Sequence, residues 1–281
     1  MQILKDAKEF QKLCLEWRAQ GQRLALVPTM GAYHAGHQSL MYAAKASGAR
    51  VLVSLFVNPT QFGPDENLAA YPRDPERDAV IARDAGAEVL FMPDPQSMYE
   101  ADHAIWIEAP ALARTLCAIF RPGHFRGVCT VVLKLLLLSQ ANLAFFGEKD
   151  WQQLVVIRRM VRDLNVPVKI LGCPVVRETD GLALSSRNAY LTPEERAQAP
   201  QIQAGLQQAR ELVRRGENSA GSLCAAVREH WIRHLPLGRE EYLSLVHPYS
   251  LEYLDTIGGA ALMACAVRLG KARLIDNILL P

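Results

Sequence analysis

Residues 24–37 read LALVPTMGAYHAGH, and this segment sets the architecture of the chain. Its first four residues form a short apolar run of the kind that makes a buried strand. A proline and two glycines then interrupt the run, and an apolar-periodic segment continues as far as Gly48. The pattern predicts a strand, a tight turn and then a helix over residues 37–47.

The turn brings two histidines, His34 and His37, to the start of that predicted helix. The first backbone N–H groups of a helix lack internal partners, and the aligned peptide dipoles leave partial positive charge there, so the place attracts an anion. Gly36 has no side chain, which lets a phosphate approach the backbone closely. An imidazole can donate a hydrogen bond to a phosphate oxygen whose charge grows as phosphorus is attacked.

Two other interpretations of the histidine pair stay open on these residues alone. A His-x-x-His pair is half of a metal site, although paired ligands on a helix usually stand four residues apart and no cysteine or carboxylate cluster lies nearby. The two imidazoles can also be unrelated surface residues. Other segments of the chain must decide between these interpretations.

Candidate ligands also follow the next predicted strands. Gln61 comes after the apolar run RVLVSLFV, and its amide suits the hydroxyl and carboxylate groups of a small acid, or it bonds only to nearby backbone. Lys149 follows the run LAFF and offers an ammonium to the charge spread over a triphosphate. Asp150 and Gln153 beside it are explained by a helix capping box without any ligand.

Two hydroxyls and a guanidinium are adjacent in the sequence at Ser185, Ser186 and Arg187, shortly after Gly181. These groups can close on phosphate oxygens, or the segment is a polar linker. Residues 121–127, RPGHFRG, form a glycine-rich basic loop, which on its own is simply a helix start with solvated arginines.

The order of strand, polar motif and helix repeats along the first part of the chain. Because ligands collect beyond the carboxyl ends of strands in a doubly wound sheet, we predict an α/β, Rossmann-like doubly wound parallel sheet on which the motifs converge. Residues 88–92 and 168–171 are expected to form further strands of this sheet and residues 105–107 a short strand. Leu112, Leu116 and Ile119 are expected to form the apolar face of a helix. Beyond residue 191 the sequence TPEE starts one helix that should run to about residue 215, a second helix is expected over residues 220–234, and three short strands follow. The predicted domains are therefore 1–176 and a smaller α+β C-terminal domain at 177–281.

The composition fits a globular protein that binds small molecules. Of the 281 residues 50% are hydrophobic, and a formal net charge of +2 without a basic stripe indicates no nucleic-acid partner. Polar residues interrupt the apolar stretch at 128–146, and charges near Met1 argue against a signal peptide, so we expect no membrane association. Six isolated cysteines predict buried, reduced thiols and a cytoplasmic location.

The motif HAGH resembles the His-x-Gly-His signature of nucleotidylyltransferases, and the longer PTMGAYHAGH is similar to that of the pantothenate synthetases, or pantoate–β-alanine ligases. The resemblance covers nearly the whole chain. Residues 56–62, FVNPTQF, match the family residue for residue, and residues 121–127 and 180–188 resemble two further family strings. One departure is Glu100, where the family often has proline, which leaves the shape of that loop open.

The resemblance implies a set of site residues, with His37 as a proton donor and no metal ligands from the protein. The catalytic residues would be His34, His37, Lys149 and Arg187. The ATP-binding residues would be Met30, Gly31, His34, Gly36, His37, Gly147, Glu148, Lys149, Asp150, Val176, Leu184, Ser185, Ser186 and Arg187. Gln61 and Gln153 would bind pantoate, and Gln61 would also bind β-alanine. Residues 121–127 would fold over the site, and domain 177–281 would close on the ATP.

The resemblance also implies an activity, the ATP-dependent condensation of (R)-pantoate with β-alanine to pantothenate. A pantoyl adenylate would form with release of pyrophosphate, Mg²⁺ would bridge phosphate oxygens, and the enzyme would be a homodimer. One alternative is a nucleotidyltransferase that acts on a phosphate ester, which would want extra basic residues at its acceptor. Another is a nucleotide-binding regulator without catalysis, in which the set of hydrogen-bond donors should be broken, whereas here every donor is present.

Overall fold

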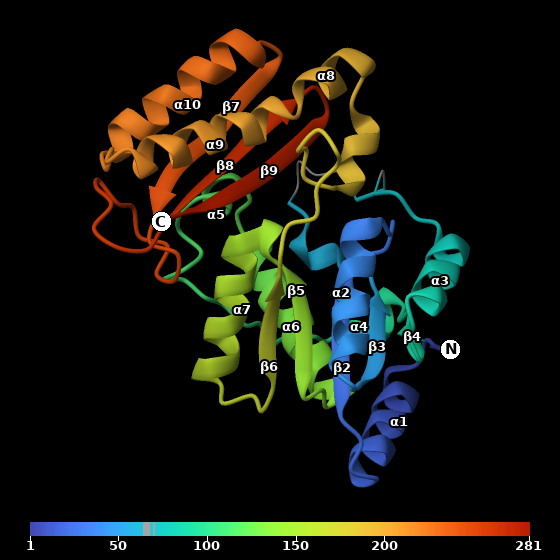
Figure 1. Cartoon of the computed structure of the whole chain (residues 1–281). Helices are drawn as coiled ribbons and strands as arrows, with labels where there is room; N and C mark the ends of the chain where they lie inside the picture. Colours follow the sequence, from blue (N-terminus) through green and yellow to red (C-terminus); the bar gives the residue numbers. More distant parts are fainter. Residues whose placement is uncertain (64–67, 70) are drawn as a thin grey trace. The chain divides into compact units, whose positions relative to one another are not determined.

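The computed structural model describes residues 1–63, 68–69 and 71–281 and divides into two compact units, each with its own sheet (Figure 1). Unit 1 comprises Met1–Ala111, Arg121–Glu148 and Val156–Pro174. Unit 2 comprises Leu112–Phe120, Lys149–Val155 and Val175–Pro281. The chain therefore crosses between the units several times.

Unit 1 is built on a six-stranded sheet of order β1-β4-β3-β2-β5-β6, in which every pairing is parallel. The strands are β1 (Gln2–Leu4), β2 (Leu24–Thr29), β3 (Arg50–Leu55), β4 (Val89–Phe91), β5 (Leu143–Gly147) and β6 (Lys169–Cys173). The predicted doubly wound sheet is confirmed. Only β1 had no counterpart in the sequence analysis, because three residues at a sheet edge are too few to show a periodicity.

The sheet reverses its direction of growth at β2. From β2 the chain adds β3 and then β4 on one side, and β5 returns to pair with the other side of β2, where Ala25 lies opposite Leu143. Ligands bind beyond the carboxyl ends of the strands at such a reversal. The segments that follow Thr29 and Gly147 therefore begin at the place where a parallel sheet offers a binding site.

Both faces of β2 are buried, as its unbroken apolar sequence predicts for a central parallel strand. Ala25 and Val27 belong to a hydrophobic cluster with Met41 of α2 (Ala35–Ala46) and Ala82 of α3 (Pro75–Asp84). Three further helices in this unit are α1 (Ala7–Ala19), α4 (Pro95–Met98) and α6 (His124–Ser139). Helices α1 and α6 contact each other, and α6 also contacts β2.

Three expectations about local structure are corrected. Residues 105–107 form no strand, since Ile105 is 74% exposed and has no partner strand in the described chain. Helix α6 begins at His124, so half of the predicted 121–127 loop is helix. Of the helix predicted from Leu112, Leu116 and Ile119, only the short α5 (Cys117–Phe120) forms, with Leu116 at a positive φ of 50° immediately before it.

Unit 2 contains an antiparallel sheet of order β7-β8-β9, formed by β7 (Gly238–Val246), β8 (Ala261–Leu269) and β9 (Ala272–Leu280). Helices α9 (Gln201–Arg214) and α10 (Ala220–His234) contribute Leu206 and Val227 to a hydrophobic core with strand residues such as Met263. The TPEE start is confirmed as a capping box on the short helix α8 (Pro193–Gln198). Pro200 separates α8 from α9, where the sequence analysis expected one helix.

All six cysteines are buried free thiols, as expected for reduced residues in a chain of this size. Burial raises the pKa of Cys14 and of Cys129 to about 12, so both remain protonated at neutral pH. In the described part of the chain, no helix is both long enough and apolar enough to cross a membrane.

Candidate active site

Helix α2 starts two residues earlier than predicted, because His34 is its N-cap. The backbone N–H of Gly36 donates to His34 Nδ1 at 3.1 Å, and the backbone N–H of His34 donates to His37 Nδ1 at 3.3 Å. The two side chains form a capping box, a role for which serine, threonine or an acidic residue is usual. Because histidine is not a common cap, sequence patterns predicted the turn but not the first residue of the helix.

This capping box fixes which nitrogen of each ring carries the proton. A ring nitrogen that accepts a hydrogen bond has no hydrogen of its own, so the neutral imidazoles of His34 and His37 are protonated at Nε2. The ring centroids lie 4.1 Å apart, and both side chains are half-buried. The turn therefore provides two imidazole N–H donors beside the N-terminus of a helix, where an anion is favoured.

The backbone before the histidines is held by Asp78, a residue of α3 that the sequence analysis did not select. Its carboxylate accepts from the backbone N–H of Ala32 at 2.7 Å and of Tyr33 at 2.8 Å, and Asp78 is only 1% exposed. Gly31 has a φ of +87°, and a Cβ there would stand 2.8 Å from Asp78 Oδ2. Glycine is thus required both by conformation and by the approach of this carboxylate.

Gln61 lies in the 3₁₀ turn η1 (Pro59–Gln61) and is 7% exposed. Its side-chain amide donates to Met30 Sδ at 2.8 Å and accepts from Asn58 Nδ2 at 3.2 Å. Asn58 is held in turn by the hydroxyl of Tyr99, which donates to Asn58 Oδ1 at 2.9 Å. Hydrogen bonds to Met30 and Asn58 therefore fix the orientation of the Gln61 side-chain amide. Asn58 was not selected from the sequence, although it belongs to the string FVNPTQF that matches the family.

The RPGHFRG segment supports Gln61 from behind. His124 is 8% exposed and its Nδ1 donates to the Gln61 backbone carbonyl at 2.8 Å. A side chain at Gly127 would collide with the Thr60 carbonyl, so glycine allows α6 to pack against η1. The first turn of α6 therefore supports η1 through His124 and Gly127, while Arg126 in the same turn is exposed.

In unit 1 the structure places Met30, Gly31, His34, Gly36 and His37 after β2, and Gly147 and Glu148 at the end of β5. These two strands are the neighbours at which the sheet reverses. Met30 joins the first group to Gln61 through its sulfur. The unit 1 residues of the predicted site thus gather at the carboxyl ends of adjacent strands of one sheet.

In unit 2, Lys149 of the 3₁₀ turn η2 (Glu148–Asp150) donates from Nζ to the Leu184 carbonyl at 3.2 Å. Burial lowers the pKa of Lys149, the carboxylates of Asp150 and Asp276 raise it, and the guanidinium of Arg187 lowers it. The ammonium of Lys149 therefore lies within reach of two carboxylates and of the guanidinium of Arg187. Arg187 is the second cation of the predicted site, and it lies close enough to influence the first.

The segment from Val176 to Arg187 folds back on itself. The Leu184 backbone N–H donates to the Val176 carbonyl at 3.0 Å, and Gly181 turns the chain with a φ of +97°. Ser185 then caps the 3₁₀ turn η3 (Ser186–Tyr190), because its Oγ accepts from the Arg187 backbone N–H at 3.3 Å. The predicted loop is therefore an ordered turn whose residues Ser185, Ser186 and Arg187 are half-buried.

Two adjacent glutamines at the start of α7 (Trp151–Asp163) have different surroundings. Gln152 is 7% exposed and donates to the carbonyls of Leu112 and Thr115 at 3.0 and 2.9 Å, so its amide supports backbone. Gln153, the predicted pantoate ligand, is half-buried one position further. Nothing in the sequence distinguishes these two amides apart from the family likeness.

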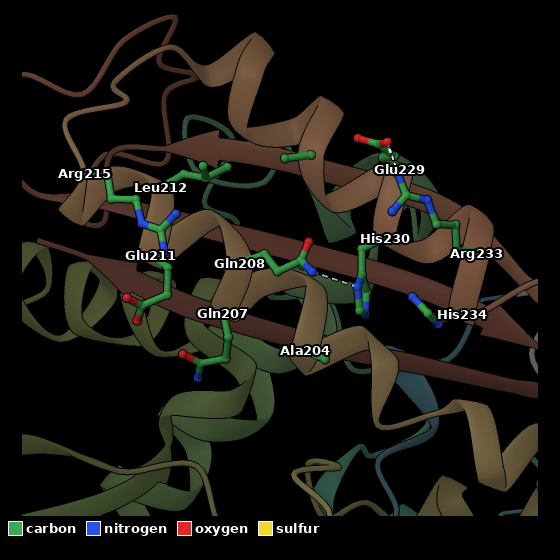
Figure 2. A pocket seen from close by; sticks show the side chains of 11 residues that line it. Ala204, Gln207, Gln208, Glu211, Leu212, Arg215, Glu229, His230, Arg233 and His234 are labelled. Atoms are coloured by element: carbon green, nitrogen blue, oxygen red, sulfur yellow. Dashed lines mark hydrogen bonds and ion pairs between the residues drawn. The ribbon is translucent and has the colours of Figure 1, made fainter.

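A separate hollow of about 540 Å³ lies between α9 and α10 and contains none of the predicted site residues (Figure 2). His230 uses both ring nitrogens there, 3.0 Å from Gln208 Nε2 and 2.9 Å from Gln201 Oε1, and Arg233 pairs with Glu229. We assign no ligand to this hollow between α9 and α10. Among the described residues, no three His, Cys, Asp or Glu side chains gather as a metal site would require.

Comparisons with known proteins identify the family of this chain. The family model described as Pantoate-beta-alanine ligase matches residues 2–279. The pantothenate synthetases of Nitratidesulfovibrio vulgaris (strain Miyazaki F) and Desulfovibrio desulfuricans are 61% and 62% identical over 280 residues, which cover 100% of this chain and 99% of each relative.

Solved structures give the same result. Pantothenate synthetase from Thermus thermophilus has a TM-score of 0.93 at 43% identity, with 99% of each chain covered. Pantoate-beta-alanine ligase from Francisella tularensis, complexed with beta-gamma ATP and beta-alanine, has a TM-score of 0.80 at 33% identity, covering 99% of this chain and 97% of that one. The chain therefore belongs to the pantoate–β-alanine ligase family, the pantothenate synthetases, whose members use ATP to join pantoate to β-alanine.

Proposed function

We propose that this chain carries out the family's reaction through a pantoyl adenylate, with the predicted site residues in the roles given below. The observation that carries the proposal is the His34–His37 capping box. It sets two Nε2–H donors at the N-terminus of α2, beside the reversal point of the parallel sheet. Donors that are already oriented need no rearrangement when charge develops on a phosphate.

In the first step a carboxylate oxygen of pantoate forms a bond to the α-phosphorus of ATP. The bond from that phosphorus to the bridging oxygen breaks, and pyrophosphate leaves. A carboxylate is already a nucleophile at neutral pH, so this step needs positioning and charge stabilisation more than a general base. His34 and His37 donate hydrogen bonds to the α-phosphate oxygens, and the proton-donor role that the family likeness implies for His37 is that of the hydrogen-bond donor to the oxygen on which charge develops.

The cationic groups of unit 2 act on the other end of the nucleotide. Lys149 and Arg187 bind the triphosphate with the hydroxyls of Ser185 and Ser186, and their charge stabilises the pyrophosphate as it leaves. Val176 and Leu184 lie against the nucleoside, and Asp150 contacts the ribose. The mutual electrostatic influence of Lys149 and Arg187 supports this assignment.

Pantoate and β-alanine are bound by amides. Gln61 binds both substrates and Gln153 binds pantoate, since an amide can serve a hydroxyl and a carboxylate at once. In the second step the amine of β-alanine attacks the activated acyl carbon. That amine attacks as the neutral –NH2 group, the bond from the acyl carbon to the AMP oxygen breaks, and the nitrogen gives up one proton to solvent as pantothenate and AMP are released.

The residues present are consistent with Mg²⁺ that arrives with ATP. Mg²⁺ usually keeps several waters and binds phosphates instead of a cage of side chains, and the described residues contain no such cage. When bound, it would neutralise phosphate charge. Lys149, Arg187 and the two histidines would donate hydrogen bonds to phosphate oxygens.

We further propose that residues 177–281 close on ATP held by residues 1–176, that the enzyme is a homodimer and that it is cytoplasmic. Six buried free thiols and the use of ATP support the location. The dimer rests on the family likeness alone. Light scattering of the purified protein tests the dimer, and small-angle scattering with and without ATP tests the closure.

The reaction is tested by incubating the protein with pantoate, β-alanine and Mg-ATP and measuring AMP and pantothenate. Pantoate-dependent exchange of labelled pyrophosphate into ATP, without β-alanine, isolates the first step. We expect both activities. Formation of ADP, or nucleotide transfer onto a phosphate ester in place of pantoate, would contradict the proposed function.

A further inference from the structure

Strand β9 contacts both segments that carry the candidate ATP-binding residues of unit 2. Asp276 accepts a bidentate pair from Arg177, with Nη1–Oδ2 at 2.7 Å and Nη2–Oδ1 at 2.9 Å. The neighbouring Asn277 donates from Nδ2 to the Lys149 backbone carbonyl at 2.9 Å. Two consecutive residues near the end of the chain thus reach back 99 and 128 positions.

The Asp276–Arg177 pair holds the turn between Val176 and Leu184. Arg177 also donates from Nη1 to the Gly181 carbonyl at 3.1 Å, so one guanidinium spans the turn and the strand. The far arm of the turn carries the Leu184 carbonyl, which accepts from Lys149. The two segments and β9 therefore form a closed circuit of hydrogen bonds within unit 2.

The Asp276–Arg177 ion pair is suited to positioning more than to stabilising the fold. Asp276 is 4% exposed, and a buried ion pair often adds little to stability compared with apolar residues of the same size. A bidentate guanidinium–carboxylate pair does, however, fix distance and plane. The Asp276 carboxylate also raises the pKa of Lys149, so its charge reaches the ammonium assigned to the phosphates.

We propose that Asp276 and Asn277 are positioning residues for ATP, which set the distance between the Lys149 segment and the Ser185–Arg187 segment. Neither residue touches the nucleotide in this proposal, so they act through Lys149 and Arg177. The inference rests on the proposed function, which assigns these two segments to ATP. It places the last strand of the small sheet in control of nucleotide affinity and of the first step.

The test compares Asp276→Asn and Asn277→Ala with the wild-type enzyme in pyrophosphate exchange and in calorimetric titration with Mg-ATP alone. For Asp276→Asn we expect kcat/KM for ATP to fall on the order of 10²-fold, the effect of a misplacement of about 1 Å, while KM for pantoate stays within about twofold. Asn277→Ala loses the hydrogen bond to the Lys149 carbonyl and should show a smaller effect of the same kind.

The matched control is Glu241→Gln. Glu241 is the other buried carboxylate on this sheet, 2.7 Å from Arg268 Nη2 and 2.6 Å from Arg273 Nε, and both of these arginines lie outside the two ATP segments. It should lower thermal stability and leave the ATP parameters unchanged. If Glu241→Gln weakens ATP binding as strongly as Asp276→Asn does, the effect is one of general stability and the inference is wrong.

A pH profile of the exchange reaction gives a readout that general destabilisation would not move. Lys149 is faced by Asp150, Arg187 and Asp276, and removal of the Asp276 charge should shift the alkaline limb of kcat/KM to lower pH. Arg177→Lys keeps the charges and should leave the limb in place while ATP binding weakens. If the alkaline limb of the pH profile does not move in Asp276→Asn, and its KM and affinity for ATP equal those of the wild type, the inference is wrong.

Two further outcomes separate the inference from the proposed function. Suppose that the wild-type enzyme shows no exchange, but calorimetric titration shows that both variants bind ATP more weakly than the wild type. The positioning role of Asp276 and Asn277 is then supported, and the proposed reaction is contradicted. If Asp276→Asn does not fold, Asn277→Ala decides, because it removes the hydrogen bond to the Lys149 carbonyl and no charge. Wild-type ATP affinity in a folded Asn277→Ala then refutes the inference.

Discussion

Two parts of the candidate site are built in opposite ways. The His34–His37 turn is fixed mainly from within, because each histidine accepts a backbone N–H no more than three positions away. The Lys149 and Ser185–Arg187 segments are fixed by contacts with a strand that lies far ahead in the sequence. A local device can be recognised as a motif, whereas a long-range one depends on the completed fold.

The comparison also explains which residues each part can lose. A turn that holds itself depends on the few side chains that form its caps and on Asp78 behind it. Segments held from a distance depend on the whole small sheet. Substitutions can therefore separate chemistry from support in the first part more cleanly than in the second.

The largest expected effect on the exchange rate comes from substitutions of His34 that distinguish its role as helix N-cap from its role as a hydrogen-bond donor. His34→Ala removes both, whereas His34→Ser keeps a good N-cap and removes only the Nε2 donor. We expect pyrophosphate exchange to fall by roughly 10² to 10³ in both variants, because each loses a donor to the transition state. Thermal unfolding should show that His34→Ser is the more stable of the two. Wild-type exchange in His34→Ser would mean that the imidazole serves only as a cap.

A smaller loss is expected when the support behind the turn is removed. In Asp78→Asn one carboxylate oxygen is replaced by an amide that cannot accept, so one of the N–H groups of Ala32 and Tyr33 is left buried without a partner. The change should cost about 1–3 kcal/mol of folding free energy and about tenfold in exchange rate. Asp74→Asn is the control on the same helix, since asparagine caps as well as aspartate. Equal losses in the two variants would remove Asp78 from the positioning of the turn.

The pH dependence probes the second part of the comparison. Burial lowers the folded-state pKa of Lys149 below its ordinary value of 10.5, so the ammonium is lost at a lower pH than in the unfolded chain. Exchange should therefore decline as pH rises through that lowered pKa, by less than about tenfold for each pH unit. The exchange assay is needed because it contains no β-alanine amine. A rate that stays flat up to pH 10.5 would show that the charge of Lys149 is not used.

The smallest effect is expected at the second capping box of the chain, which has no role in the chemistry. Thr192→Ala removes the side chain that accepts the Glu195 backbone N–H at 3.3 Å at the start of α8. Unfolding should become easier by about 1 kcal/mol, with kcat and every KM unchanged. A change in KM for ATP would show that α8 is coupled to the site and would blur the distinction between the two boxes.

Much of the architecture was predictable because it follows from local patterns. Short apolar runs indicated β2 to β6, and Thr192 to Glu195 indicated a capping box. The predictions failed where tertiary contacts outweigh local preference. Leu116 takes a positive φ and leaves α5 short, and residues 105–107 have β-branched ends without a strand to pair with.

The sequence by itself determined the parallel sheet, the turn with its two imidazoles and the family likeness, because strand periodicity, helix ends and short motifs depend on neighbours within a few residues. Only the tertiary structure decided that Asp78 supports that turn, that Gln152 serves the backbone beside Gln153, and that Asp276 and Asn277 hold two distant segments. These contacts join residues from 37 to 128 positions apart. Their partners are set by how strands and helices pack, which no local pattern records.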